Sequence, residues 1–259
     1  GRFLMLRELL SSEFIILACL CFIGAFIDSV AGGGGLITLP AYLASGLPPH
    51  IALGTNKLSS FFSGVGSSIN YARSGKINWK LMKKLAPFSL AGAFIGVKII
   101  IGTKPQYINY IVFIALVIVL FYTMANKKMG HESTFTGLTK SNITKGMIMA
   151  FVIGFYNGFL GPGTGSFLVF FLMKIFGYDF VEANGDSKIL NLVGNLTSLL
   201  VFGISGKVYF LYGIPISIVM ILGAQCGSRC AINKGSKFIK PVFLTVTTVT
   251  VLKMLKDML

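Results

Sequence analysis

The sequence carries little charge for its length. Only 12% of its 259 residues are charged, and 8 acidic residues stand against 23 basic ones. A soluble domain has about 25% charged residues, so this composition excludes an ordinary soluble protein. Hydrophobic residues make up 54% of the chain, and the mean hydropathy is +0.79. The composition therefore predicts an all-α, multi-pass membrane protein.

Residue types that carry catalysis or bind metals are also scarce. His50 and His131 lie at predicted loop positions, and no His, Cys, Asp or Glu cluster has catalytic or metal-ligand spacing. The Walker spacing GxxxxGK[ST] is absent. We therefore expect no enzyme, no metal and no cofactor. The four cysteines lie in apolar stretches as packing residues, although Cys226 and Cys230 share a helix face and leave a pair or a metal site open.

Apolar segments account for most of the chain, and the net charge of +15 lies mainly between them. Basic loops are typical of cytoplasmic loops and of contact with anionic lipid head groups, so membrane lipid is an expected partner and nucleic acid is not. The ten segments are 14–31, 35–46, 50–72, 81–101, 106–126, 143–160, 164–177, 181–203, 209–231 and 238–256. A helix needs about 20 residues to span a bilayer. The segments 35–46 and 164–177 are shorter, so they are predicted to be half-helices or re-entrant.

The two halves of the chain repeat each other. A shift of 131 residues places Gly54 and Lys57 on Gly185 and Lys188, and Ser74-Gly75-Lys76 on Ser205-Gly206-Lys207. The sequence therefore predicts repeat 1 over 1–126, a cytoplasmic linker over 127–142 and repeat 2 over 143–259.

Charge on equivalent loops favours inverted repeats. The loop 73–84 has five basic residues where its counterpart has only Lys207, and the next pair of loops reverses the difference. Inversion places equivalent loops on opposite sides of the membrane. We therefore expect loops 73–84, 127–145 and 229–240 in the cytoplasm.

Two glycine-rich breaks are candidates for binding. Gly32-Gly33-Gly34-Gly35 and Gly161-Pro162-Gly163-Thr164-Gly165 each open a short segment. Helix N-termini meeting near the midplane would suit an anion, and tight helix packing or a plain turn is the alternative. The residues proposed here for binding are Gly33, Gly34, Gly35, Gly163, Thr164 and Gly165.

Lysines within apolar segments form the second candidate set. Lys57 and Lys188 lie one to two turns into segments, where ionisable residues are costly and usually functional. Snorkelling to the head groups or a structural ion pair are the alternatives. Asp28 and Asp186 are expected to neutralise them or to carry a proton. Neighbouring polar residues complete this proposed substrate site: Thr55, Asn56, Ser187 and Asn191. Further polar residues on these segments fit helix–helix hydrogen bonding or a pathway lining: Ser59, Ser60, Ser63, Asn70 and Asn195.

At these motifs the chain resembles the sulfite exporter TauE/SafE family, also called the toluene sulfonate uptake permease family. The resemblance rests on the stretch from Asp28 to Pro40, on Leu53-Gly54-Thr55-Asn56-Lys57, and on the stretch from Gly158 to Gly165. It covers essentially the whole chain. It implies secondary transport, across the bacterial inner membrane, of sulfur-containing anions such as sulfite, sulfonates, sulfoacetate or thiosulfate. Family members often have Ala-Thr-x-Lys where this chain has Gly185-Asp186-Ser187-Lys188.

A secondary transporter, exporting a small sulfur oxyanion or organosulfonate, is therefore the leading functional hypothesis. An anion channel or a carrier for a different small organic anion is the alternative. Because the cytoplasm is electrically negative, export of one anionic charge gains about 2.3 kcal/mol per 100 mV. Assembly as a homo-oligomer is left open.

Overall fold

The computed structural model describes residues 11–102, 117, 121, 130 and 132–258, and these form helices and connecting loops without a strand. The described helices are α2 (Ser12–Ala31), α3 (Gly35–Ala44), α4 (Pro49–Arg73), α5 (Trp79–Ile100), α7 (Lys140–Phe159), α8 (Thr164–Phe176), α9 (Phe180–Ile204), α10 (Phe210–Lys234) and α11 (Ser236–Met258). The predicted all-α fold class is confirmed.

Nine predicted segments coincide with these helices to within about three residues at each end, and the segment 106–126 falls almost wholly outside the described residues. In the predicted linker 127–142, residues 127–129 and 131 fall outside them too. Helices α3 and α8 have 10 and 13 residues. At a rise of about 1.5 Å per residue they are roughly 15 and 20 Å long. Neither reaches across a hydrocarbon core of about 30 Å, as their short segments predicted.

The duplication extends to backbone detail. Helices α4 and α9 begin and end 131 residues apart. Each ends at a serine followed by a glycine with positive φ, which is 68° at Gly75 and 66° at Gly206. Glycine is required there because other residues rarely adopt this conformation. Helices α4 and α9 therefore end with the same backbone geometry.

The two repeats interlock. Helix α5 packs along α7 of the other repeat, and its counterpart α10 packs along α2. Small residues allow both contacts, since a Cβ atom added at Gly92 or Gly96 would meet the backbone of α7, and one added at Gly223 or Gly227 would meet the backbone of α2. Close backbone approach of this kind is a common way of packing helices where the surroundings are as apolar as the side chains.

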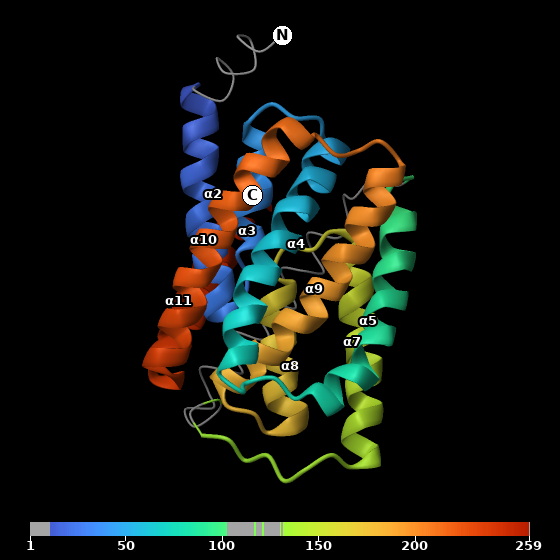
Figure 1. Ribbon diagram of the computed structural model, residues 1–259, viewed down its shortest axis with the longest axis vertical. Coiled ribbons are helices and arrows are strands. Elements are labelled where there is room, and N and C mark those ends of the chain that lie inside the picture. Colours follow the sequence, from blue (N-terminus) through green and yellow to red (C-terminus); the bar gives the residue numbers. More distant parts are fainter. Residues whose placement is uncertain (1–10, 103–116, 118–120, 122–129, 131, 259) are drawn as a thin grey trace.

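Equivalent helices run in opposite directions. Gly54, near the start of α4, contacts the backbone of Lys207 just beyond the end of α9, and Gly185 of α9 contacts Lys76 just beyond the end of α4. The antiparallel course of α4 and α9 can be followed in Figure 1. An inverted duplication requires this relation between counterparts.

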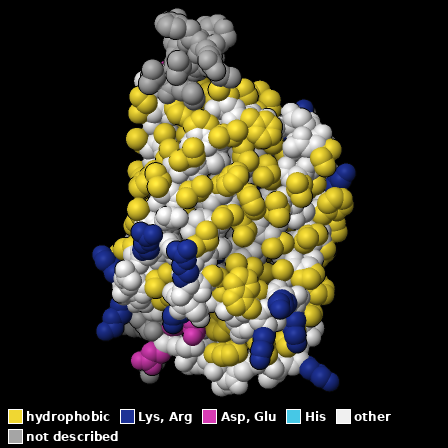
Figure 2. Space-filling model, viewed as in Figure 1, with side chains coloured by type: hydrophobic (Ala, Val, Ile, Leu, Met, Phe, Trp, Pro, Cys, Tyr) yellow, Lys and Arg dark blue, Asp and Glu magenta, His cyan; other side chains and the backbone are white. Residues whose placement is uncertain are grey.

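The outer surface is apolar over much of its height. Figure 2 shows hydrophobic side chains over most of one face, with Lys and Arg gathered mainly towards its lower end, where α4 ends and α5 begins. Exposed large side chains include Ile16, Phe94, Leu200 and Ile218. Within the described part of the chain, α2, α9 and α10 are long and apolar enough to cross a membrane by length and composition. These features suit a polytopic membrane protein.

Candidate functional site

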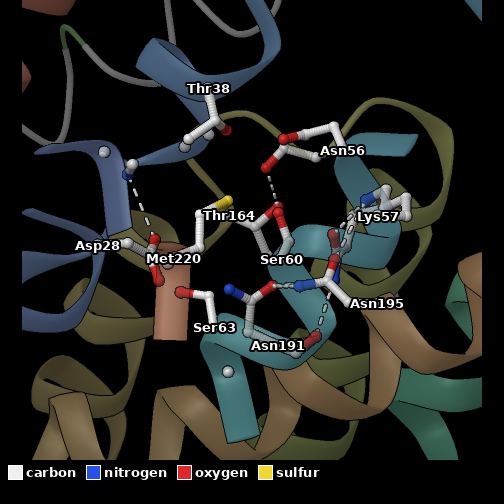
Figure 3. A pocket seen from close by; sticks show the side chains of 18 of the residues that line it. Asp28, Thr38, Asn56, Lys57, Ser60, Ser63, Thr164, Asn191, Asn195 and Met220 are labelled. Carbon is white, nitrogen blue, oxygen red and sulfur yellow. Dashed lines mark hydrogen bonds between the residues drawn. The ribbon is translucent and has the colours of Figure 1, made fainter. Parts of the chain in front are cut away.

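A small cavity of about 40 Å³ lies where the two glycine breaks meet α4 and α9. Figure 3 shows polar side chains pointing into it from several helices. Its walls come from both repeats: Gly24, Asp28, Gly34, Gly35, Thr38, Asn56, Lys57, Ser60, Ser63, Gly64, Asn157, Gly161, Gly163, Thr164, Gly165, Lys188, Asn191, Asn195 and Met220. The volume suits a few water molecules or one compact ligand.

The glycine breaks bring the first turns of α3 and α8 to this cavity. Gly32 and Gly33 have φ values of 75° and 87°, and Gly161 and Gly163 have values of 96° and 81°. The two breaks also touch, because a Cβ atom added at Gly165 would lie 2.8 Å from the Cα atom of Gly32. Close packing and a turn therefore do occur here. The same geometry places two helix N-termini, which carry positive partial charge, beside the cavity.

Helix periodicity turns equivalent residues of α4 and α9 towards the cavity. Positions 57, 60 and 64 of α4 correspond to 188, 191 and 195 of α9, and all six line it. Residues spaced by three, four or seven lie on one face of a helix. The side chain of Asn191 accepts from Asn157 Nδ2 at 3.1 Å and from Asn195 Nδ2 at 3.4 Å. The amides hold one another in place within the wall (Figure 3).

The two lysines are buried but have different partners. Lys57 and Lys188 are 2% and 1% exposed, so neither snorkels to the surface. Lys188 Nζ donates to the carboxylate of Asp28 at 2.9 Å and to the Asp28 backbone oxygen. Lys57 Nζ donates to Asn157 O at 2.5 Å and Oδ1 at 2.8 Å, and to Asn195 Oδ1 at 3.4 Å. Within the described residues Lys57 therefore contacts neutral oxygens and no carboxylate.

Asp28 also contacts the start of α3. Its Oδ1 atom accepts from Gly34 N at 3.3 Å while Oδ2 accepts from Lys188. A carboxylate at a helix N-terminus is favoured by the exposed N–H groups and the helix dipole. In repeat 1 an internal anion thus lies between a lysine and a helix start. Asn157, which binds the other lysine, is the neutral counterpart of Asp28.

Most of the predicted site residues meet at the cavity, and four lie elsewhere. Gly33, Thr55, Asp186 and Ser187 are not part of its lining. Thr55 Oγ1 accepts from Tyr209 N at 2.9 Å, and Ser187 Oγ donates to Asn184 O at 2.8 Å. Both hydroxyls thus have structural roles.

Asp186 is the counterpart of Thr55 and makes the equivalent contact. Its Oδ1 atom accepts from Asn78 N at 2.7 Å. It faces a separate cavity, and the ion pair shown for Lys188 is with Asp28. Asp28 therefore forms the ion pair for which the sequence left both Asp28 and Asp186 as candidates.

The other polar residues on α4 and α9 divide between the two expected roles. Ser60, Ser63 and Asn195 line the cavity. By contrast, Ser59 hydrogen bonds to Tyr42 of α3, and Asn70 Nδ2 donates to Ser228 Oγ of α10 at 2.8 Å. Cys226 and Cys230 are free thiols, as are Cys19 and Cys21.

Sequence reasoning missed Asn157 and Thr38. Asn157 precedes Gly161 by four residues, as Asp28 precedes Gly32, so aligning the breaks on these glycines would have found it. Thr38 left no such signal. Thr38 Oγ1 and Asn56 Oδ1 are buried at the cavity without a hydrogen-bond partner among the described residues. Buried polar atoms are almost always satisfied, if necessary by water or a ligand, so both are available to whatever fills the cavity.

Comparison with known proteins agrees with a transport role. The model of a family described as sulfite exporter TauE/SafE matches residues 16–254. The chain is 36% identical to probable membrane transporter protein ORF9 of Sinorhizobium sp, over 91% of this chain and 90% of the relative. It is 31% identical to probable membrane transporter protein YfcA of Escherichia coli (strain K12), over 93% and 89%. A probable membrane transporter protein of Haemophilus influenzae is also 31% identical, over 93% and 94%. No solved structure matches the chain.

Proposed function

Because the chain belongs to the sulfite exporter TauE/SafE family, we propose that this membrane transporter is a secondary transporter of small sulfur-containing anions. Sulfite, sulfonates, sulfoacetate and thiosulfate are the candidate substrates. The proposed location is the bacterial inner membrane, which the chain crosses several times, and the proposed direction is export.

The single observation that carries this proposal is the buried ammonium of Lys57. Burying a charge is costly unless an opposite charge compensates it, and the oxygens around Lys57 Nζ in the described structure are those of neutral Asn157 and Asn195. Two ammonium groups and one carboxylate line the cavity, since Asp28 is paired with Lys188. The lining therefore has a formal excess of one positive charge, which an anion would balance.

Comparison of the two repeats suggests where the anion binds. In repeat 1 the Asp28 carboxylate lies between Lys188 and the start of α3. In repeat 2 Lys57 lies beside the break before α8, since a Cβ atom added at Gly161 would be 2.6 Å from Lys57 Nζ. The carboxylate is absent there, because its counterpart is Asn157. We infer that the substrate anion takes this second position, with Thr164 and Asn56 beside it.

We further propose that the repeats are inverted across the membrane. The antiparallel course of α4 and α9 supports this, as does the gathering of Lys and Arg towards one end of the molecule (Figure 2). The end that holds loops 73–84 and 229–240 is then cytoplasmic. Export of one anionic charge from there gains about 2.3 kcal/mol per 100 mV of membrane potential.

Flux measurements in proteoliposomes test the proposal. Vesicles containing purified protein are loaded with sulfite, thiosulfate or a short sulfonate, and efflux is followed under a potassium-clamped membrane potential. We expect saturable efflux in which these anions compete with one another. Linear, non-competing flux would instead indicate a channel, and flux of carboxylates alone would indicate a carrier for a different organic anion. Absence of flux for every sulfur anion would refute the proposal.

A further inference from the structure

A second cavity, of about 410 Å³, lies at the end of the molecule that we assign to the cytoplasm. It is formed by the loop between α4 and α5 together with the beginning of α9. Its charged and polar lining consists of Lys76, Asn78, Lys80, Tyr178, Glu182 and Asp186. The anion site described above uses none of these residues.

Asp186 is the unusual member of this lining. It is 1% exposed, and its Oδ1 atom accepts from Asn78 N at 2.7 Å. The second carboxylate oxygen, Oδ2, is buried and has no hydrogen-bond partner at normal distance among the described residues, although the Tyr178 hydroxyl lies near enough to interact with the carboxylate. A buried carboxylate oxygen without a partner is destabilising. A small ligand that binds to Oδ2 would reduce this free-energy cost.

The duplication provides an internal control for the role of Asp186. Its counterpart Thr55 accepts from Tyr209 N, and Tyr209 is the counterpart of Asn78. A hydroxyl therefore suffices to make the same backbone contact in repeat 1. The carboxylate in repeat 2 is not needed for the fold, and its unpartnered oxygen is the part that the hydroxyl lacks.

Two residues near Asp186 are also acidic in repeat 2 where repeat 1 has uncharged residues. Asp179, Glu182 and Asp186 correspond to Pro48, Ile51 and Thr55. Repeat 2 thus places three of the eight acidic residues of the chain within eight positions, at the start of α9. Asp179 and Glu182 are used by the helix, because each accepts a backbone N–H of the other in a capping box. Of these three carboxylates, Asp186 is the one with a buried oxygen that lacks a partner at normal hydrogen-bond distance.

We propose that Asp186 binds a proton from the cytoplasm and thereby regulates the anion site. This inference rests on the proposed transport function. A proton fits better than Ca²⁺ or Mg²⁺, since these cations need about six oxygen ligands and the lining of the cavity includes the cationic Lys76 and Lys80. The described residues also contain no group of three His, Cys, Asp or Glu able to hold a metal.

The groups that face Asp186 come from three segments. Tyr178 precedes α9, Glu182 lies one turn earlier on α9, and Lys76 and Lys80 belong to the α4–α5 loop and the start of α5. Burial raises the pKa of the Tyr178 phenol above its ordinary range, so this group stays protonated and neutral at physiological pH. Asp186 is the group whose charge changes without breaking a helix cap.

The effect on the anion site is electrostatic. Asp186 lies two residues before Lys188 on α9, a rise of about 3 Å along the helix axis, although it points to a different face. Protonation removes a negative charge near the cavity and so strengthens anion binding. At an effective dielectric constant of about 20, a charge about 10 Å away changes affinity by roughly tenfold. Export is therefore faster when the cytoplasm is acidic.

The test uses proteoliposomes whose orientation is determined from protease access to loop 73–84. The substrate is a short sulfonate, because its charge is constant between pH 6 and pH 8. We expect efflux by the unmodified protein to rise about fivefold to tenfold on acidification of the side that holds this loop, and to be insensitive to pH on the opposite side. Asp186→Thr, which copies repeat 1, and Asp186→Asn should both transport with a flat pH profile. Glu182→Gln is the matched control and should keep a pH-dependent efflux that is displaced to lower pH, because a negative charge that faces Asp186 is removed.

The outcomes separate the two proposals. No sulfonate flux at any pH would overturn the transport function and this inference with it. Three outcomes would overturn the proton site alone. Efflux could be independent of pH in the unmodified protein, its pH dependence could persist in both Asp186 variants, or its pH dependence could be lost in Glu182→Gln. Infrared difference spectra on acidification provide a readout besides transport: a protonated-carboxyl band should appear in the unmodified protein and be absent from a folded Asp186 variant. A band that persists in that variant would also overturn the inference.

Discussion

Replacement of Lys57 by methionine tests the central assignment most directly. Methionine keeps the length and most of the volume of the side chain but removes the ammonium group. In the described structure this ammonium contacts only the oxygens of Asn157 and Asn195. The change therefore removes the uncompensated positive charge and leaves the Asp28–Lys188 ion pair intact.

The expected effect follows from the contact that the ammonium would make with an anion. A hydrogen bond to a charged group contributes about 1.5–3 kcal/mol, which corresponds to roughly a 10- to 150-fold increase in Kd. The loss of folding stability should be smaller than for Lys188→Met, because no partly buried carboxylate is left without its cation. Removing the ammonium group also removes the free-energy cost of burying it. This gain offsets part of the cost of leaving Asn157 O without a donor.

The assay measures anion affinity and efflux for the two proteins in parallel with their thermal unfolding. Lys98→Met removes an exposed cation from α5 and is the matched control, which should bind as the unmodified protein does. A folded Lys57→Met variant whose Kd for every transported sulfur anion stays within twofold of the unmodified protein would refute the reasoning. So would an equal loss in Lys98→Met, because the effect would then reflect overall charge.

Further predictions concern stability at the same site. Lys188→Met should destabilise the protein by about 1.5–3 kcal/mol because it leaves the half-buried Asp28 carboxylate without its cation. Lys188→Met with Asp28→Asn should recover most of this loss; thermal unfolding of the single and double variants gives the coupling, and additive losses would contradict the ion pair. Gly165→Ala should abolish folding or transport, since its Cβ atom would lie 2.8 Å from Gly32 Cα. A Cβ atom added at Gly203 in α9 meets nothing within 4 Å, so Gly203→Ala should be neutral or stabilising by about 0.5–1 kcal/mol. Size-exclusion chromatography measures the folded protein for both glycine variants. Equal losses for Gly165→Ala and Gly203→Ala would show that the contact between the breaks is unimportant.

Helix positions and the duplication could be read from the sequence because both depend on local patterns. Apolar runs set the helix ends, and repeated motifs such as Ser74-Gly75 and Ser205-Gly206 recur with the same backbone geometry. Lys57 and Lys188 were identifiable as unusual because charge is rare in such segments. These inferences needed no knowledge of how the helices pack.

The partners of the two lysines could not be read in this way. Asp28 and Asn157 lie 160 and 100 residues from the lysines that they bind, and only the interlocked packing brings them together. The position of Asp186 was more accessible to sequence reasoning. Residues two apart on a helix do not face each other, so helix geometry alone argues against Asp186 as a partner of Lys188, and the same holds for Thr55 and Lys57.

The exchange of partners between the repeats has a consequence for biogenesis. Helix α5 packs along α7, and α10 packs along α2, so in the described part of the chain the glycines of α5 and α10 are covered by a helix of the other repeat. During synthesis the first half must wait in the membrane, partly uncovered, until the second half is inserted. With the inversion proposed above, an ancestral single-copy protein would have needed a second copy of itself, in the opposite orientation, to form a complete molecule. Fusion of two such copies would free each from the symmetry, so that Asp28 can serve as a fixed anion while Asn157 leaves room for the proposed substrate anion.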